Sequence, residues 1–412
     1  MKLSHTLTAT SALFDDPNLV SSAGLVPMLA LAESAGLRDL ADEHLTVPSD
    51  KGANAGLKVS SLVGAMVAGA DSIDDMALLR HGGMGRIFTR AYAPSTLGSF
   101  LRAFAFGHVR QLDAIASRFL IALAGLTHAL GDPSRPDDGN NGNAADGGYA
   151  LLDVDDTIIE VHGHAKQGAG FGYTGVRGLN ALLATLAVSF AGTRTAPVIV
   201  AQRLRKGSTG SPRGAKRLVA DAVRTASRLL GKDHPVLVRM DSAFYGRGAV
   251  HAALAGGAAV SVTVRMDKAV KRAIAMIGDE AWSSIEYTDA VYDELAGRWV
   301  SRAEVTEIEF TAFSAQKKTD QVPGRLIVRR IPDFNAAKKA AAGQGTLFDV
   351  WRFHAFFTTA DPGVLDTVAA DKTHRGHAII EQVHADLKGS ALAHLPCRPG
   401  CSPRTPLGWC SR

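Results

Sequence analysis

Three short acidic segments, far apart in the chain, restrict what it can fold into more than any other feature. LLDVDDTIIEV (151–161) and VLVRMDSAFYG (236–246) are rich in β-branched and aliphatic residues and predict strands, one with aspartates inside it and one ending on aspartate. HAIIEQVHADLK (377–388) predicts a helix, with Glu381 and Lys388 two turns apart on one face. A buried strand tolerates carboxylates only if they are paired or bind a cation. The fold must therefore bring these acids to partners.

Carboxylates from two strands and one helix can converge on a pair of Mg²⁺ ions, and such a site breaks and rejoins phosphodiester bonds. Because side chains alternate across a strand, Asp153 and Asp155 are expected on one face and Asp156 on the other. These acids could instead cap a turn or pair with arginines, since structural ion pairs also gather carboxylates. The first segment alone leaves both roles open.

The other two segments also allow a purely structural role. Asp241 lies at the carboxyl end of its predicted strand, where open α/β sheets place their chemistry, but it or Ser242 could simply cap the next helix. Glu381 lies among apolar residues of a predicted helix and could face either a cleft or solvent. The combination of the three segments, and none of them singly, favours a metal site.

The composition fits a globular protein of two or three domains. The chain has 412 residues, of which 46% are hydrophobic and 21% charged. Its net charge of +5 suits a polyanionic partner, although many proteins with this balance bind none. No signal peptide opens the sequence and no apolar run approaches the ~20 residues of a membrane helix, so we expect a cytoplasmic protein without a membrane partner. The three cysteines, Cys397, Cys401 and Cys410, all lie near the end, which argues against a disulfide framework.

The hydrophobic periodicity changes along the chain and predicts its domains. A helical pattern is followed by the low-complexity break GDPSRPDDGNNGNAADGG, by an alternation of strands and helices, and by a β-rich stretch before the final helices. Low-complexity polar sequence buries no core, so the break predicts a linker or a surface loop. The predicted boundaries are 1–130 (helical), 131–148 (linker), 149–266 and 359–396 (α/β core), 267–358 (β-rich insertion) and 397–412 (aberrant tail without folded structure).

Three longer stretches of sequence carry a family resemblance. DVDDTIIEVHGHAKQGAGFGYTGVRGLNALLAT (153–185), VRMDSAFYGRGAV (238–250) and HAIIEQVHADLKGSALAHLP (377–396) resemble bacterial insertion-sequence transposases of the family numbered 1380. The resemblance covers roughly residues 20 to 396 and includes a lysine two turns after the glutamate. It implies an α/β fold of the RNase H-like kind, a mixed sheet with a β-rich insertion, preceded by a helical N-terminal domain.

The resemblance also implies an activity and a set of metal ligands. Asp155, Asp241 and Glu381 would form the Asp-Asp-Glu triad of a DNA transposase and hold two ions, Mg²⁺ or Mn²⁺, with Asp153 as second choice for the first ligand. Water would cut at the ends of the element, and the freed 3′-OH would attack target DNA. The implied partners are terminal inverted repeats, target DNA and, as a homodimer, a second copy of the chain in a bacterial, nucleoid-associated complex.

Residues for DNA binding follow from the same comparison. Related families often place Tyr and Arg seven and four residues before the glutamate, where this chain has His374 and His377, so Arg375 could supply the missing charge. The remaining candidates near the site are Lys388, Lys166, Tyr173 and Arg177, with Arg203, Arg205 and Lys206 further along the chain. In the helical domain they are Arg80, His81, Arg86 and Arg90, which could also be ordinary solvated arginines and histidine. Trp299 could stack on a flipped base or lie in a core.

The tail CRPGCSPRTPLGWCSR departs from the family. Related transposases continue with a helix similar to AANAAWLVLA, and a one-base shift of a back-translated CSPRTPLGWCSR permits VFAANAAWLVLA, which predicts a frameshift near codon 396. Two alternative functions stay open. The chain could be a metal-dependent nuclease of the same fold, or a catalytically inactive relic that only binds DNA.

Overall fold

The computed structural model describes most of the chain: residues 16, 18–48, 50–88, 90–127, 130, 148–162, 166–190, 193–285, 291–293, 298–300, 303–332 and 351–390. The predicted linker, apart from Gly148, and the predicted tail lie outside these residues. The chain divides into two compact units. We call Met1–Leu126, Ile159–Ala169 and Asp386–Arg412 the helical unit, and Thr127–Ile158 and Gly170–Ala385 the sheet unit.

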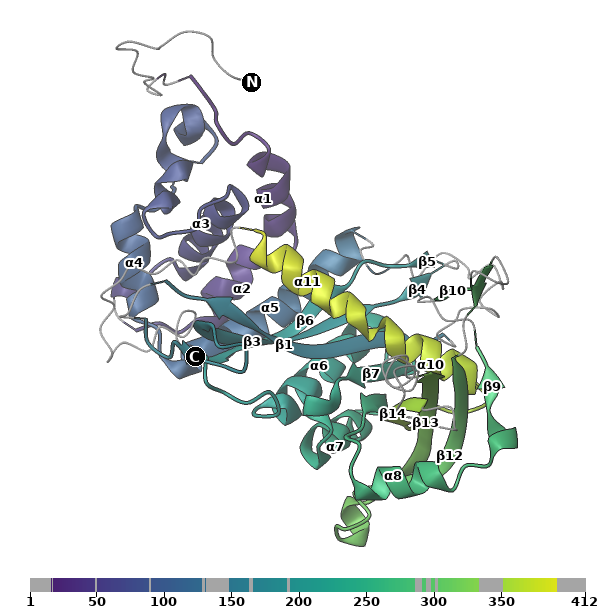
Figure 1. Ribbon diagram of the computed structural model, residues 1–412. Helices are drawn as coiled ribbons and strands as arrows, with labels where there is room; N and C mark the ends of the chain where they lie inside the picture. Colours follow the sequence, from purple (N-terminus) through teal and green to yellow (C-terminus); the bar gives the residue numbers. More distant parts are fainter. Residues whose placement is uncertain are drawn as a thin grey trace. The chain divides into compact units, whose positions relative to one another are not determined.

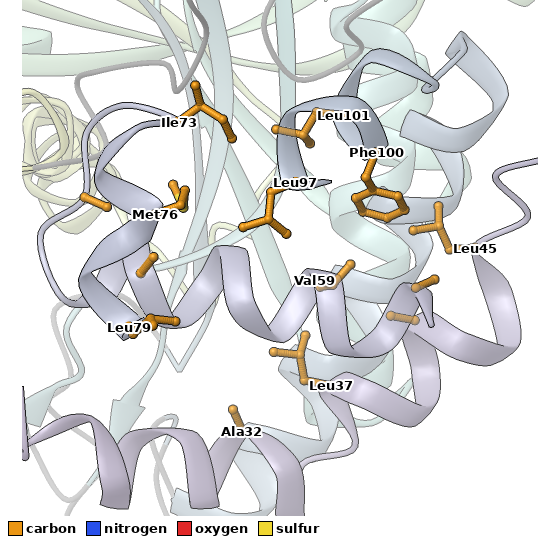
Figure 2. Close-up of a cluster of buried hydrophobic side chains, with 14 of the residues drawn as sticks. Ala32, Leu37, Leu45, Val59, Ile73, Met76, Leu79, Leu97, Phe100 and Leu101 are labelled. Atoms are coloured by element: carbon orange, nitrogen blue, oxygen red, sulfur yellow. The ribbon is translucent and has the colours of Figure 1, made fainter. Parts of the chain in front are cut away.

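The helical unit is built from short helices around one apolar core. Its α-helices are α1 (Leu25–Ser34), α2 (Leu37–His44), α3 (Ala55–Val67), α4 (Pro94–Arg102) and α5 (Phe106–Thr127), and its 3₁₀ helices are η1 (Asp50–Gly52), η2 (Asp75–Arg80) and η3 (Gly82–Arg86). Figure 2 shows the core, to which α3 contributes Val59, η2 contributes Met76 and Leu79, and α4 contributes Leu97 and Phe100. These helices bury their apolar sides against each other, so the unit has a core of its own.

The apolar periodicity predicts longer helices than this unit has. Residues 25–45 have the spacing of one helix but form two, because Gly36 takes a left-handed conformation (φ 79°), which glycine adopts without strain. Residues 96–126 likewise have the pattern of one helix but form α4 and α5, with a break around Ala103. Residues 72–83 predict a helix preceded by Ser72 as its cap, but form 3₁₀ turns. Ser72 still caps these turns, since the Asp75 main-chain N–H donates to Ser72 Oγ (3.3 Å) while Ser72 donates from its own N–H to Asp75 Oδ2 (3.1 Å).

The sheet unit has a large mixed sheet whose centre carries the acidic segments. The middle strands lie in the order β6 (Val198–Lys206), β3 (Arg177–Ala187), β1 (Ala150–Glu160), β7 (Val236–Met240) and β8 (Ala259–Thr263). β7 is parallel to both β1 and β8, and β6 is antiparallel to β3. β2 (Gly170–Phe171) pairs antiparallel with the first residues of β3, and Figure 1 labels the neighbouring strands β6, β3, β1 and β7. The long apolar strand β1 is buried along most of its length, as expected of a central strand.

The β-rich stretch continues this sheet. β14 (Trp351–Thr358) pairs antiparallel with β8, followed outwards by β13 (Val322–Pro332), β12 (Glu304–Ala312) and β9 (Ser283–Ser284). The strands of the predicted insertion therefore share backbone hydrogen bonds with the core, and the 267–358 boundary divides the sequence without dividing the sheet. Two small hairpins lie off it: β4 (Ser189–Phe190) with β5 (Thr193–Arg194), and β10 (Val291–Asp293) with β11 (Arg298–Val300).

Helices cover the sheet and connect its strands. α6 (Ala215–Leu230) contacts β3 and β6, and α7 (Arg247–Ala255) contacts β8. The other helical elements are α8 (Lys268–Ala275), α10 (Thr367–Arg375), α11 (Ile379–Lys388), and the 3₁₀ turns η5 (Ser242–Phe244), η6 (Asp279–Ala281), η7 (Lys318–Asp320) and η8 (Gly376–Ala378). None of the helices in the described residues is long and apolar enough to cross a membrane.

A substitution at Gly207 tests how closely the backbones of β2, β3 and the turn after β6 approach one another. A Cβ atom at this position would lie 2.0 Å from the main-chain oxygen of Gly178 and 2.4 Å from that of Gly170. We expect Gly207→Ala to lower the free energy of unfolding by about 3 kcal/mol, because backbone atoms must move apart. Thermal and urea unfolding of the full chain would measure the loss.

Gly210→Ala is the matched control. It lies on the same turn, and a Cβ there meets nothing within 4 Å. Its effect should stay within about 0.5 kcal/mol. Equal stability of the two variants would contradict the close approach seen at Gly207.

Candidate active site

Asp155 and Asp241 lie side by side at the centre of the sheet. The parallel register pairs Val154 of β1 with Met240 of β7, so the next residue on each strand is an aspartate. Neighbouring strands are about 4.8 Å apart, which brings the two carboxylates to one point. The carboxyl end of a central parallel strand is where open α/β sheets place their chemistry. The structure thus brings together the two acids that the sequence predicted.

Both aspartates are harder to ionise than a free carboxyl. Burial, together with the charges of Asp241 and Asp156, raises the pKa of Asp155 to about 6 against the opposing effects of the Asp156 main-chain N–H and His377. Burial likewise raises the pKa of Asp241, although its Oδ1 accepts a hydrogen bond from the Ala243 N–H (3.0 Å) and so caps η5. The capping role and a role in the site therefore coexist at Asp241.

A bound cation fits this pair of acids. Within the described parts of the chain, neither Asp155 nor Asp241 pairs with a lysine or an arginine at ion-pair distance. Two adjacent carboxylates with raised pKa values repel each other, and a divalent metal relieves that repulsion. Their donor atoms are all oxygens, which suit hard ions such as Mg²⁺ and Mn²⁺.

Asp153 lies two residues earlier on the same face of β1 and has a different environment. Arg239 of β7 is fully buried and donates from Nε to Asp153 Oδ1 (2.7 Å) and from Nη2 to Asp153 Oδ2 (2.6 Å). His377 Nδ1 lies 2.8 Å from the same Oδ1. Burial pushes the pKa of Asp153 up, but the Arg239 and His377 charges outweigh it and the pKa falls below its ordinary value. Both oxygens already have hydrogen-bond partners, so Asp153 forms the arginine pairing that the sequence left open, and its role as a metal ligand stays a prediction.

Asp156 points to the opposite face of β1, as the alternation predicted. Its Oδ2 accepts from Asn180 Nδ2 and from Arg205 Nη2 (3.1 Å). Arg205 also donates from Nε to Asn180 Oδ1 (2.9 Å) and is buried. The charge of Arg205 is therefore paired inside the fold, and its contact with DNA stays a prediction. Of the other basic candidates on β6, Arg203 forms an ion pair with Asp221 of α6.

The helical segment 377–388 contacts β1 through two histidines. His377 contacts Asp153, and His384 Nδ1 lies 3.7 Å from Asp155 Oδ2. Glu381 lies between them at helical spacing, four residues after one and three before the other, so all three share one face. Glu381 itself is exposed. Among the described residues no three His, Cys, Asp or Glu side chains lie close enough to hold one metal ion, so Glu381 does not cluster with Asp155 and Asp241, and its role as a ligand stays a prediction.

The predicted DNA-binding residues lie in varied surroundings. Arg375 donates from Nε to Asp371 Oδ2 (2.9 Å), and Asp371 also pairs with Arg329 (3.2 Å). The Nδ1 atom of His377 contacts Asp153, as described above. Lys388 is the exposed last residue of α11, and Lys166 belongs to the helical unit. Arg177 begins β3, Trp299 lies on β11 opposite Tyr292, and Arg80, His81, Arg86 and Arg90 are all exposed.

Tyr173 lies beside the acidic pair. Its hydroxyl donates to the main-chain oxygen of Asp156 (3.3 Å). Burial raises the pKa of Tyr173, and the charges of Asp156, Asp155 and Asp241 raise it further, which places the phenol within electrostatic reach of all three acids. Of the DNA-binding candidates in the sheet unit, Tyr173 therefore has a direct connection to the strand that carries the site.

Sequence reasoning missed two residues that shape the site, Arg239 and His384, and did not predict the surroundings of His374. Arg239 is visible in the sequence as an arginine inside the apolar strand VLVRM, a pattern that requires a buried acid. His384 gave no comparable signal. His374 is buried, stacks on Phe356 at 4.1 Å and has hydroxyl partners on both ring nitrogens, Ser261 Oγ (2.8 Å) and Thr263 Oγ1 (2.9 Å). Burial and the nearby positive charges hold the pKa of His374 well below its ordinary value, which favours the neutral imidazole.

The strand order β6-β3-β1-β7-β8 is that of an RNase H-like α/β fold, with Asp155 inside β1 and Asp241 directly after β7. The sequence profile described as "Transposase DDE domain" matches residues 146–399, and the chain belongs to this family. The fold class predicted from the sequence is thereby confirmed. Membership makes the chain one of a class of enzymes that cleave and transfer DNA and that generally use divalent metal ions. No curated protein matches the chain.

The Arg239–Asp153 pair predicts a large effect on stability. We expect Arg239→Met to lower the free energy of unfolding by about 3–5 kcal/mol, because it leaves the buried Asp153 carboxylate without its cation. The double variant Arg239→Met/Asp153→Leu should recover most of that loss, since neither charge remains. Chemical unfolding of the three proteins measures both effects.

An exposed ion pair provides the control for this prediction. Arg247 pairs with Asp320 while its side chain is 55% exposed, so Arg247→Met should cost no more than about 1 kcal/mol. A double variant as unstable as Arg239→Met alone would show that lost packing, and not the unpaired charge, causes the destabilisation.

Asp155 predicts a stability that falls as the pH rises. A carboxyl with a raised folded-state pKa favours the folded state below its unfolded pKa of 3.8, and that contribution is lost as the pH rises towards about 6. Asp155→Asn removes this penalty and should make the metal-free chain more stable at pH 7, by on the order of 1–2 kcal/mol after allowance for solvent screening.

Melting temperatures between pH 4 and pH 8 in EDTA, and again with Mn²⁺, test this prediction. Added Mn²⁺ should stabilise the parent chain and leave Asp155→Asn unchanged, because ligand binding to the folded state raises its stability. A variant that loses stability in EDTA, or that still responds to Mn²⁺, would contradict the placement of Asp155 in a metal site.

Proposed function

We propose that this chain is a DNA transposase that cuts at the ends of an insertion sequence and joins them to target DNA. Asp155, Asp241 and Glu381 would hold two divalent ions, Mg²⁺ or Mn²⁺. The observation that carries the proposal is the pair Asp155–Asp241, two adjacent carboxylates with raised pKa values, one inside β1 and one directly after the parallel strand β7. Divalent ions bound there would activate the attacking oxygen and stabilise the leaving one.

The chemistry needs two successive attacks on phosphorus. In the first, water breaks the bond between the 3′ oxygen of the element and the phosphate, which releases a 3′-OH. In the second, that 3′-OH attacks a phosphate of target DNA and displaces a target 3′ oxygen. Asp155 and Asp241 hold the centre on rigid strands, as precise positioning requires. No covalent intermediate with the protein is needed.

Glu381 completes the proposed ligand set from the helical side. Its helix is attached to β1 at two points, the His377–Asp153 contact and the approach of His384 to Asp155. Glu381 lies between these points on the same helix face, and its exposure leaves its carboxylate accessible to ions and DNA. In this proposal Asp153 acts through Arg239 and His377 to hold the helix and is not a ligand.

The wider assignment extends the family membership. We propose that the chain belongs to the insertion-sequence family numbered 1380, that it works as a homodimer on terminal inverted repeats, and that residues 1–130 bind those ends. Phosphate contacts would come from exposed or partly exposed positions, among them Lys388, Lys166, Tyr173 and Arg177. Arg375 and His377 already have acidic partners, and each would contact phosphate only from its remaining donors.

The experiment that tests the function is cleavage of DNA carrying the element's own ends. With Mn²⁺, Asp241→Asn, Asp155→Asn and Glu381→Gln should each reduce cleavage by at least about a hundredfold, since loss of a residue that only supports a ligand already costs 10–100-fold. Glu309→Gln, which neutralises an exposed acid on β12, is the matched control and should cut normally. Normal cleavage by Asp241→Asn would refute the proposed site.

The same assay separates the alternative functions. Joined products between end and target DNA distinguish a transposase from a nuclease of the same fold, which would yield cut ends alone. Binding of ends without any cutting would identify an inactive relic, the outcome favoured if the reading frame shifts near codon 396. That shift falls in residues outside the described parts of the chain, and resequencing of the locus tests it, because an uninterrupted frame contradicts it.

A further inference from the structure

The edge of the sheet formed by β2 and its connection to β3 carries two exposed aromatic side chains. Phe171, at the end of β2, is 67% exposed and Tyr173, two residues later, is 71% exposed. Val176, on the same connection to β3, is exposed as well. Large apolar side chains that cluster on a small area of the surface often mark a binding site. We call Phe171 and Tyr173 the aromatic platform.

The platform lies on a part of the backbone that cannot easily move. A Cβ at Gly172, between the two aromatic residues, would lie 2.8 Å from the Gly207 main-chain oxygen and 2.9 Å from Ile158 Cδ1. The chain between the two rings is thus pressed against β1 and against the turn after β6. A ring held on fixed backbone loses little conformational entropy when a ligand stacks on it.

The platform is next to the acidic pair and next to positive charge. Tyr173 reaches β1 through its hydrogen bond to the Asp156 main-chain oxygen. Phe171 lies directly opposite Arg177 in the β2–β3 register. A ligand on these rings would therefore have its flat apolar part on Phe171 or Tyr173 and an anionic part towards Arg177. The ligand atoms next to these two parts would lie near Asp155 and Asp241.

A nucleotide has this combination of a flat apolar base and an anionic phosphate. Within a duplex both faces of a base are covered by its neighbours, so a protein ring can stack only on a base that has left the helical stack. We propose that Phe171 and Tyr173 stack on an unpaired DNA base beside the bond that is cut, with Arg177 on an adjoining phosphate. The inference rests on the proposed function and adds that the DNA is locally unpaired at the site.

The test compares DNA with and without unpaired bases. The full chain, without divalent metal so that the DNA stays intact, is titrated onto a blunt duplex and onto the same duplex with a short 3′ overhang containing 2-aminopurine. We expect the parent chain to bind the overhang duplex about tenfold more tightly and to change the 2-aminopurine fluorescence.

Substitutions that keep apolar area but remove the rings isolate stacking. Phe171→Leu/Tyr173→Leu should lose the preference for the overhang and the fluorescence change, whereas Phe171→Trp/Tyr173→Trp should keep both. Met276→Leu, at an 82% exposed position, is the control for an unrelated surface change. A parent chain without the preference, or a leucine variant that retains it, would overturn the platform.

Cleavage by the same proteins keeps this inference separate from the proposed function. Metal-dependent cutting that Asp241→Asn abolishes and the leucine variant leaves unchanged would uphold the function and overturn the platform. A chain that shows the aromatic-dependent preference but never cuts DNA would overturn the function and uphold the platform as a DNA-binding surface.

Discussion

The contact between Arg239 and Asp153 holds the site together. Arg239 is fully buried, donates to both Asp153 oxygens and also donates to the main-chain oxygen of Thr373 in α10. One guanidinium thus joins β7, β1 and the helices that lead to Glu381. Burying a charge is costly unless it is paired with good geometry, and here the pair fixes three segments that are far apart in the sequence. This contact connects β1 and β7, the two strands that position the Asp155–Asp241 pair.

Sequence reasoning found the two strand aspartates because their signals are local, whereas the RNase H-like fold class was implied by the family resemblance. An apolar strand with acids in it, and another that ends on aspartate, predict acids on a central sheet without knowledge of distant contacts. The alternation along β1 also placed Asp156 correctly on the opposite face from Asp153 and Asp155. The ligand assignments of Asp155, Asp241 and Glu381 themselves stay predictions.

The surroundings of a side chain could not be predicted where its interaction partner lies elsewhere in the chain. Asp153 and Asp155 are equivalent by alternation, and only the register that sets Arg239 opposite Asp153 separates an ion-paired acid from an unpaired one. Arg205 seemed to be a surface cation until the fold brought Asn180 and Asp156 to it. The helix breaks at Gly36 and around Ala103 were missed because apolar periodicity continues through them. Long-range pairing is not encoded in any window of local sequence.

The attachment of Arg239 to Thr373 also has a consequence for biosynthesis. Asp153 and Arg239 are 86 residues apart, and Thr373 follows Arg239 by a further 134. Contacts at such separations form late, because long loops must close first. A ribosome-bound chain that has released β1 and β7 but not α10 therefore lacks the carbonyl partner of Arg239 and the glutamate helix. An active site that needs Glu381 would therefore be assembled only after residues 377–388 have been translated, well after the strands that carry Asp155 and Arg239.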